Sequence, residues 1–211
     1  MTSQSHRDEQ PPSSSILTVC TGNICRSPLA EQIIRHRLQQ SEVAGFTVAS
    51  AGLHAAVNAP MEPLPATLSR ELGGDPTGSH GKQITQEAVD SAQLVLTMTL
   101  KQRDELVKKF PGAAQRTFTM AEFARAGQRL PVVEAAAVTA ATSWAAVTGT
   151  ATDSPVAELV RRTAALRSTA ELTSTDDIPD PINADESVHR DVARRIDDYC
   201  RDVVSVLSHH L

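Results

Sequence analysis

The sequence predicts an α/β fold with one four-stranded parallel sheet between two layers of helices. Short apolar runs alternate along the chain with amphipathic stretches, which is the order of βαβ units. The run at residues 94–98 is almost wholly apolar, as expected of a parallel strand that is covered on both faces. With 211 residues, the chain is long enough for one sizeable core and an inserted segment.

The predicted elements alternate regularly up to residue 120. An apolar run at 16–19 predicts the first strand, and apolar residues at helical spacing predict a helix over 27–40. A later helix is expected to end near Gly73 and Gly74. The expected order is strand 16–19, helix 27–40, strand 46–51, helix 60–72, strand 94–98, helix 101–110 and strand 117–120.

Residues 126–175 form a predicted helical insertion before the last loop of the chain. Its alanine-rich part, 131–147, is expected to be helical. A second helix is expected to begin with Ser154 as its cap and Pro155 in its first turn. The apolar residues that follow on one face are Val156, Leu159, Val160 and Leu166. We therefore predict a helical hairpin inserted into a single domain that spans residues 16–211.

The last predicted helix spans residues 185–207. Apolar residues recur in it at helical spacing, which predicts one face packed on the core. These residues are Val188, Val192, Ile196, Cys200, Val203 and Leu207. Because Cys200 lies on this face, we expect it to be a buried structural thiol.

Composition and charge limit the classes of partner. The net charge of −5 predicts no general attraction to nucleic acid or to an anionic membrane surface. Residues 1–15 are polar with paired prolines, so we expect a disordered tail rather than a signal peptide or an anchor. The run at 135–152 falls short of a membrane span, and three cysteines do not make a disulfide scaffold. We expect a cytoplasmic protein, and the oligomeric state is left open.

One stretch between the first strand and the first helix carries the chemistry. It reads Cys20-Thr21-Gly22-Asn23-Ile24-Cys25-Arg26-Ser27-Pro28. A tight loop in this place turns successive backbone N–H groups toward its centre, at the positive end of a helix, and so forms an anion site. We expect Gly22 to supply a backbone conformation that a side chain would resist, and Pro28 to fit the first helical turn.

The side chains of this loop predict covalent phosphoryl transfer. The ring of N–H donors and the Arg26 cation should keep Cys20 as a thiolate near neutral pH. The planar guanidinium of Arg26 can hold two oxygens of a tetrahedral oxyanion, and Ser27 can donate its hydroxyl proton to the sulfur. A thiolate inside a phosphate cradle is a nucleophile for phosphorus. The alternative is that Cys20 and Cys25 are small apolar residues at a strand–helix junction.

The nine residues from Cys20 to Pro28 resemble the signature loop of the low-molecular-weight protein tyrosine phosphatases, whose fold also serves one class of arsenate reductases. The resemblance implies that Cys20 is the nucleophile and Arg26 the phosphate clamp. It further implies that Asn23 shapes the loop and that Ser27 is the partner of the thiolate. The substrate-binding residues that it implies are Thr21, Gly22, Asn23, Ile24, Cys25, Arg26 and Ser27.

Two further segments resemble supports of this loop. Ser50 opens Ser50-Ala51-Gly52, which resembles the family element whose serine hydrogen-bonds the signature loop. His80 lies in a segment that resembles the one in which a histidine supports the loop through Asn23. The alternatives are a plain loop serine and a plain loop histidine.

The acidic stretch at 176–181 resembles the Asp-Pro loop of the family, whose aspartate is the general acid. Asp180, followed by Pro181, is the match, and Asp177 is the second candidate. A carboxyl group is needed here because a phenolate leaves more easily when a proton arrives with it, and the same group can later take a proton from water.

The resemblance therefore implies hydrolysis of phosphotyrosine, in a protein or a small aryl phosphate, through a cysteinyl-phosphate on Cys20. This scheme uses neither a metal ion nor a cofactor. Two readings of Cys25 stay open: a packing residue, or a partner that forms a protective disulfide with Cys20, as in family members.

The sequence departs from the family pattern at the walls of the pocket. Family members usually carry aromatic residues after the Asp-Pro pair, where this chain has Ile182 and Asn183. They also often carry one after the Ser-Ala-Gly element, where Leu53 and His54 stand here. Trp144 of the insertion is a candidate replacement if the hairpin folds over the site.

Two other functions stay open at this stage. The first is an arsenate reductase that uses an external thiol, since no cysteine lies between Cys25 and Cys200 to relay a disulfide. The second is a weakly active regulator that binds phosphoproteins.

Overall fold

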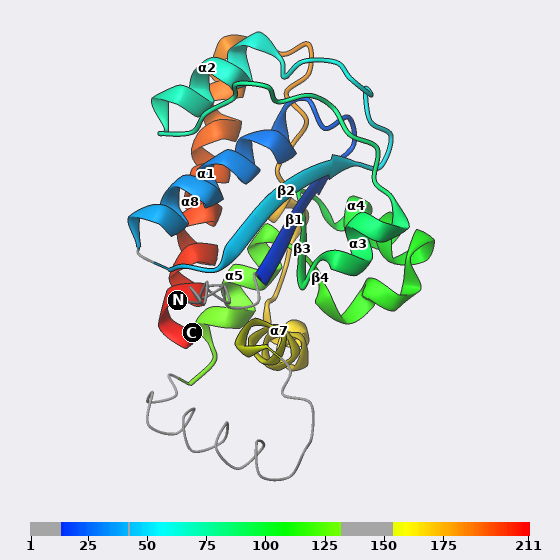
Figure 1. Ribbon diagram of the computed structural model, residues 1–211, viewed down its shortest axis with the longest axis vertical. Coiled ribbons are helices and arrows are strands. Elements are labelled where there is room, and N and C mark those ends of the chain that lie inside the picture. The colour runs from blue at the N-terminus through cyan, green and yellow to red at the C-terminus, as the bar shows by residue number, and fades with distance from the viewer. Residues whose placement is uncertain (1–13, 42, 132–153) are drawn as a thin grey trace, which may run out of the picture.

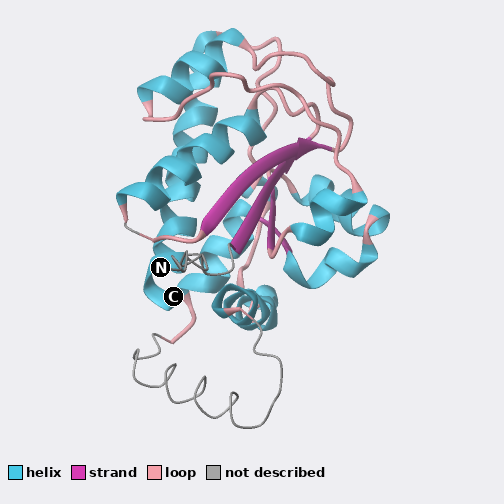
Figure 2. Cartoon of the chain, viewed as in Figure 1, coloured by secondary structure: helices cyan, strands magenta, loops and turns pink. Residues whose placement is uncertain are grey.

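The computed structural model describes residues 14–41, 43–131 and 154–211. Its centre is one sheet of four parallel strands in the order β2-β1-β3-β4 (Figure 2). The strands are β1 (Ser14–Cys20), β2 (Phe46–Gly52), β3 (Leu94–Thr97) and β4 (Thr117–Thr119). The predicted α/β fold with a four-stranded parallel sheet is therefore confirmed.

Helices cover both faces of this sheet (Figure 1). Against one face lie α1 (Arg26–Gln40), α5 (Met120–Gln128) and α8 (Glu186–His210), with α2 (Pro63–Glu71) packed on α1 and α8. Against the other face lie α3 (Gln86–Ser91), α4 (Leu100–Lys109) and the 3₁₀ helix η1 (Pro111–Arg116).

Each face of the sheet has its own core because side chains alternate along a strand. In β1, Ile16 and Cys20 belong to the core that α1 and α8 complete. Leu17 and Val19 belong to the core that α3 and α4 complete. Cys20 thus ends β1 at the carboxyl edge of the sheet, on the side of α1.

The predicted boundaries of these elements are confirmed to within three residues, but the helix α5 that follows the fourth strand was not predicted. Met120 begins α5 instead of ending β4. Thr119 and Glu122 explain the difference, because each side chain accepts a hydrogen bond from the backbone N–H of the other and together they form a capping box. The short helix α3 was not predicted either, since six residues show too little periodicity.

The disordered tail predicted for residues 1–15 does not include its last two residues. Ser14 and Ser15 belong to β1, where they pair with Phe46 and Thr47 of β2. Residues 1–13 lie outside the described part of the chain.

The second helix of the predicted insertion is confirmed as α7 (Pro155–Ala165). Ser154 caps it by accepting a hydrogen bond from the Ala157 N–H, and Pro155 occupies the first turn. Val156, Leu159 and Val160 are buried in it, and Leu166 packs partly buried against the same core. The first predicted helix, 131–147, and Trp144 lie outside the described residues.

The chain enters α7 at the end of the sheet opposite to Cys20. The Ser154 hydroxyl accepts a hydrogen bond of 2.8 Å from Gln93, which directly precedes β3. On α7, Arg162 donates to the carbonyl of Pro131 at 3.4 Å. Both described ends that flank residues 132–153 therefore lie near the amino ends of the strands (Figure 1).

The predicted last helix is confirmed as α8, and Cys200 is fully buried in it. Val188 is the exception on the predicted apolar face, because its side chain is 39% exposed. The first turn of α8 extends past the core. Val188 therefore has the helical spacing of a buried residue, but no described element covers its side chain. No helix within the described residues is both long and apolar enough to cross a membrane.

Candidate active site

The loop between β1 and α1 wraps its backbone around the sulfur of Cys20. Cys20 is 2% exposed, and the backbone N–H of Asn23 donates to its Sγ at 3.3 Å. Asn23 has a φ of 55°, in the left-handed region that asparagine tolerates better than most residues. The expectation that Gly22 supplies the special backbone conformation is therefore wrong, because Gly22 is not among the residues of positive φ.

Three buried polar side chains continue from the sulfur into the protein. The Ser27 Oγ lies 3.0 Å from the Cys20 Sγ. The Asn23 amide nitrogen donates to the hydroxyl oxygens of Ser27 and Ser50 at 2.9 Å each. Ser50 thus makes the contact with the loop that the sequence predicts.

The predicted contact of His80 with Asn23 is wrong. The exposed His80 ring has its hydrogen bond with the carbonyl of Gly78, at 2.8 Å. The Asn23 Oδ1 instead accepts from the backbone N–H of Lys82, also at 2.8 Å. Support for Asn23 comes from the predicted segment, but from a main-chain group two residues after the histidine.

Arg26 is 4% exposed and points toward the loop that precedes α8. Its Nη1 donates to the carbonyl of Ile178 at 3.1 Å, and its Nη2 donates to the Asp180 Oδ2 at 2.5 Å. Its Nε–H is buried without a hydrogen-bond acceptor among the described residues. A buried guanidinium N–H left unpaired is unfavourable, so this donor is suited to an oxyanion bound in the loop.

Of the acidic residues at 176–180, Asp180 is the one that reaches Arg26. Its side chain is 44% exposed, and its Oδ1 accepts from the Ile182 N–H at 3.3 Å. Asp177 accepts from the Leu100 N–H at 2.8 Å and so holds the start of α4. Asp176 forms an ion pair with Arg125, whose hydrogen bonds lower the pKa of the Asp176 carboxyl.

The sulfur, the guanidinium and the Asp180 carboxylate face one small cavity. Its apolar walls are Ile24 and Ile182. Of the predicted binding residues, Thr21 and Ser27 do not line it. The remaining lining residues are Cys20, Gly22, Asn23, Cys25, Arg26 and Asp180.

The two residues after the Ser-Ala-Gly element do not form a wall of this cavity. Leu53 is 2% exposed and belongs to the core beneath α3 and α4. The exposed His54 ring pairs with Glu105 at 2.7 Å. The apolar contact at the mouth of the cavity comes instead from Ile182, directly after the Asp-Pro pair.

Gln102 of α4 is a supporting residue that the sequence did not indicate. Its Nε2 donates to the Thr21 hydroxyl at 3.0 Å, and its Oε1 accepts from the Met98 N–H at 3.1 Å. Gln102 thereby joins the end of β3 to the loop. No local pattern marks a helix glutamine for the contact with the loop, because Thr21 is distant from it in sequence.

The other two cysteines are thiols near neutral pH. Burial, followed by the neighbouring Cys20, raises the pKa of Cys25 to about 12. Burial also raises the pKa of Cys200 well above its usual value. No disulfide joins any of the three cysteines, all of which lie in the described part of the chain.

Comparison with known proteins assigns the class to which this fold and this loop belong. A family model described as low molecular weight phosphotyrosine protein phosphatase matches residues 15–135. The chain therefore belongs to this family of phosphatases. The matched residues include the β1–α1 loop and end before Asp180.

Curated relatives of the chain include phosphatases of two specificities. A protein-arginine-phosphatase of Geobacillus stearothermophilus is 36% identical over 108 residues, which are 51% of this chain and 70% of the relative. The low molecular weight protein-tyrosine-phosphatase Etp of Escherichia coli K12 is 40% identical over 84 residues. That match covers 40% of this chain and only 53% of Etp.

Solved structures give the same fold. The YwlE arginine phosphatase of Geobacillus stearothermophilus superimposes with a TM-score of 0.61 at 25% identity, covering 92% of each chain. A low molecular weight protein tyrosine phosphatase of T. tengcongensis gives a TM-score of 0.64 at 22% identity. That match covers 92% of this chain and 99% of the other.

Proposed function

We propose that the protein hydrolyses phosphotyrosine, in proteins or in small aryl phosphates, through a cysteinyl-phosphate on Cys20. The observation that carries the proposal is the cavity shared by Cys20, Arg26 and Asp180. These three residues come from the end of β1, the start of α1 and a loop more than 150 positions away. Their convergence supplies a nucleophile, an anion clamp and a proton donor at one place.

In the first step the Cys20 thiolate attacks phosphorus in line, and the bond from phosphorus to the leaving oxygen breaks. The phosphate oxygens accept from the loop N–H groups and from Arg26, including its Nε–H. Asp180 acts as the general acid and gives a proton to the leaving oxygen. The products of this step are the free phenol and the cysteinyl-phosphate.

In the second step the Asp180 carboxylate takes a proton from water, and the hydroxide attacks phosphorus. The sulfur–phosphorus bond breaks, and the thiolate leaves with a hydrogen bond from Ser27. Inorganic phosphate is released. Because Asp180 contacts the Arg26 Nη2 at 2.5 Å, a bound phosphate competes with this carboxylate for the same donor.

Phosphoarginine is the second candidate substrate, because two of the curated relatives are named protein-arginine-phosphatases. Two observations favour the aryl ester over it. Ile24 and Ile182 present apolar side chains to the cavity, which suit a ring better than a cationic guanidinium. Asp180 is the one carboxylate among the lining residues, and it is already paired with Arg26.

Steady-state hydrolysis of matched peptides tests the proposal. Phosphotyrosine, phosphoserine and phosphoarginine peptides are compared with para-nitrophenyl phosphate, and Cys20→Ser is the control. We expect Cys20-dependent turnover of the two aryl esters, at least about tenfold faster than of the other two peptides. If phosphoarginine were turned over faster than the aryl esters, the protein would be an arginine phosphatase instead.

The absence of any turnover would contradict the hydrolase. Arsenate reduction in the presence of a small thiol is then the next assay, since the same loop binds arsenate as it binds phosphate. If that fails too, tight binding of a phosphotyrosine peptide without turnover would indicate a regulatory binding protein.

A further inference from the structure

We propose that Glu31, in the second turn of α1, is a positioning residue for the Cys20 sulfur. Its carboxylate accepts the hydrogen bond of Ser50 and, together with the Lys82 backbone N–H, fixes the direction of the hydrogen bonds that run through Ser50, Asn23 and Ser27 to the sulfur. The proposal rests on the phosphatase function proposed above and adds to it a residue outside the cavity. Glu31 does not line that cavity and acts only through other side chains.

The direction of the hydrogen bonds is set first at the Asn23 amide. The Lys82 backbone N–H can only donate, so the oxygen of the amide faces it, at 2.8 Å. Both hydrogens of the amide nitrogen then point to hydroxyl oxygens, those of Ser27 and Ser50. Each of these hydroxyls therefore accepts a hydrogen bond from Asn23. Each must donate its own hydrogen bond to another group.

Glu31 accepts the hydrogen bond that the Ser50 hydroxyl donates. The Ser50 hydroxyl donates to the Glu31 Oε2 at 2.6 Å, and an ionised carboxylate can only accept. The Asn23 NH2 group cannot accept a hydrogen bond, so Glu31 is the acceptor that keeps the Ser50 hydroxyl satisfied and in this orientation. A pure acceptor at this end and a pure donor at Lys82 leave one consistent arrangement for the groups between them.

The same arrangement directs the proton of Ser27 to the sulfur. The Ser27 Oγ accepts from Asn23, and its proton can reach the Cys20 Sγ at 3.0 Å or the Ala51 carbonyl at 3.4 Å. The sulfur is nearer, and a thiolate is the stronger acceptor because it is charged. Ser27 therefore donates to the Cys20 thiolate at rest and again when the thiolate leaves phosphorus.

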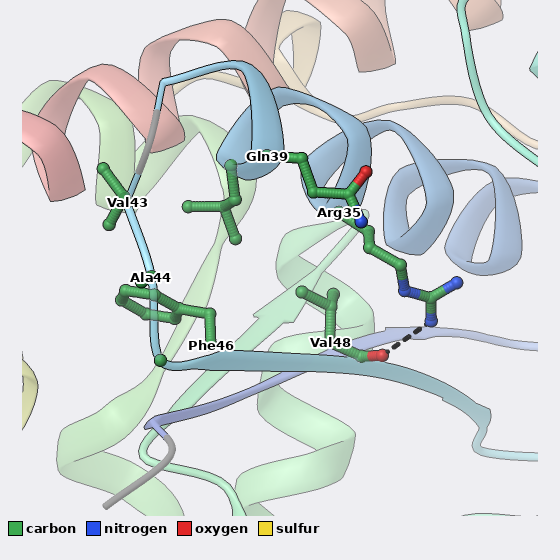
Figure 3. A pocket seen from close by; sticks show the side chains of 8 residues that line it. Arg35, Gln39, Val43, Ala44, Phe46 and Val48 are labelled. Carbon is green, nitrogen blue, oxygen red and sulfur yellow. Dashed lines mark hydrogen bonds between the residues drawn. The ribbon is translucent and has the colours of Figure 1, made fainter. Parts of the chain in front are cut away.

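Arg35 holds Glu31 in the orientation that this role requires. Its Nη2 donates to the Glu31 Oε1. The same nitrogen donates to the carbonyl of Val48 in β2 at 2.9 Å (Figure 3). Ser50 lies on the same strand, two residues further on. The Glu31 side chain is only 13% exposed, so its charge is compensated by Arg35 rather than by water. The charged and titratable side chains that line the cavity beside the Cys20 sulfur are Arg26, Cys25 and Asp180.

The variant Glu31→Gln tests whether the carboxylate sets the direction of the hydrogen bonds, because it removes the charge and keeps the size of the side chain. Its amide offers one acceptor oxygen where Arg35 and Ser50 both donate. We expect the pH midpoint for alkylation of Cys20 by iodoacetamide to rise by about one unit, since a hydrogen bond to the thiolate is weakened. The buried Cys25 and Cys200 react little in this range, and Cys20→Ser gives the blank.

Turnover supplies a second readout. If Ser27 no longer assists the departing sulfur, kcat for para-nitrophenyl phosphate should fall about tenfold, with KM falling in parallel. Acid-quenched enzyme should then contain a larger fraction of cysteinyl-phosphate. A loss of general stability would lower activity without enriching this intermediate.

Three variants act as controls. Glu31→Asp keeps a carboxylate and should retain most of the wild-type behaviour. Glu186→Gln removes an exposed carboxylate that pairs with Arg190 at the same i,i+4 spacing on α8, and it should change nothing. Ser50→Ala cuts the link between Glu31 and Asn23 and should shift the midpoint in the same direction as Glu31→Gln.

The double variant Glu31→Gln/Ser50→Ala tests whether Glu31 acts on the sulfur through Ser50. Since Glu31 acts through Ser50, the double variant should shift the alkylation midpoint no more than Ser50→Ala alone. Additive shifts, or an unchanged midpoint in a folded Glu31→Gln protein, overturn the proposal. Alkylation needs no turnover, so a wild-type protein that fails to hydrolyse any phosphate leaves this test intact and instead contradicts the function proposed above.

Discussion

The β1–α1 loop and the loop before α8 supply the two halves of the candidate site, and they are held in different ways. In the first loop, Cys20, Asn23 and Ser27 are three and four residues apart in sequence, and they bond to one another in the buried core. The second loop is held by contacts with distant elements. Asp177 bonds to the start of α4, and Arg195 of α8 donates to the Asp177 carbonyl at 2.9 Å. The Cys20 sulfur is thus held mainly by residues close to it in sequence, whereas the Asp180 carboxylate is placed by contacts with distant elements.

Replacement of the nucleophile should give the largest effect. We expect Cys20→Ser to lower kcat by a factor on the order of 10⁴ or more, because the hydroxyl is not ionised at neutral pH. The anion site is made by backbone N–H groups and Arg26, so inorganic phosphate should bind within about threefold of the wild type. Isothermal titration with phosphate and a hydrolysis assay measure the two quantities. Appreciable turnover by Cys20→Ser would contradict the mechanism.

Removal of the carboxylate from the second loop should give the next largest effect. Asp180→Ala should slow hydrolysis of phenyl phosphate by about 10²- to 10³-fold and that of an activated aryl phosphate much less, because only the poor leaving group needs the proton. Inorganic phosphate should bind more tightly to this variant, since Arg26 no longer pairs with Asp180. Equal losses for both esters would refute the role of Asp180 as the acid.

Asp177 offers a matched pair of variants that separates support from acid chemistry. Asp177→Ala removes the acceptor for the Leu100 N–H and should cost about 1 kcal/mol of folding stability and about tenfold in kcat. Asp177→Asn keeps an acceptor oxygen and should behave almost like the wild type. Thermal unfolding and steady-state rates measure both. If Asp177 were the general acid, the asparagine variant would lose as much activity as the alanine variant.

The smallest effect near neutral pH should come from Cys25. Its pKa is raised in the folded protein, to about 12, so its contribution to stability is complete below the unfolded value and is lost as the pH rises through the folded value. Between about pH 9 and pH 12 the thiol ionises only in the unfolded chain, and stability should fall by about 1.4 kcal/mol per pH unit. Denaturant unfolding of Cys25→Ala over this range should give a shallower decline. Identical slopes would indicate that the thiol is not held protonated by the fold.

The first half of the site could be predicted from the sequence because its parts are neighbours in the chain. Cys20, Ser27 and Arg26 lie within one strand–loop–helix unit, and the contact of Ser50 was implied by the resemblance of Ser50-Ala51-Gly52 to the family element. The capping box of Thr119 and Glu122 was also readable from its spacing, although no helix was predicted there and the strand was extended to Met120.

The contacts that could not be predicted join groups from distant elements or use the main chain. Nothing in the sequence distinguishes the Lys82 backbone from the His80 side chain as the partner of Asn23, because a backbone N–H has no residue signature. The sequence around Gln102 likewise gives no sign of its role, since that role depends on how α4 packs at the carboxyl edge of the sheet. The left-handed turn falls on Asn23 rather than on the adjacent Gly22 because the amide of Asn23 is bonded to three elements at once.

The attachment of α7 has a consequence for the use of this protein on a surface. Ser154 bonds to Gln93 at the amino ends of the strands, whereas Cys20 stands at the carboxyl end of β1. The seven residues of β1 separate these two ends by about 20 Å. A short tether introduced just before Ser154 would therefore anchor the molecule by its far end. Immobilised in this way on a sensor chip, the domain should present its cavity to the flowing solution, with the whole sheet between the cavity and the support.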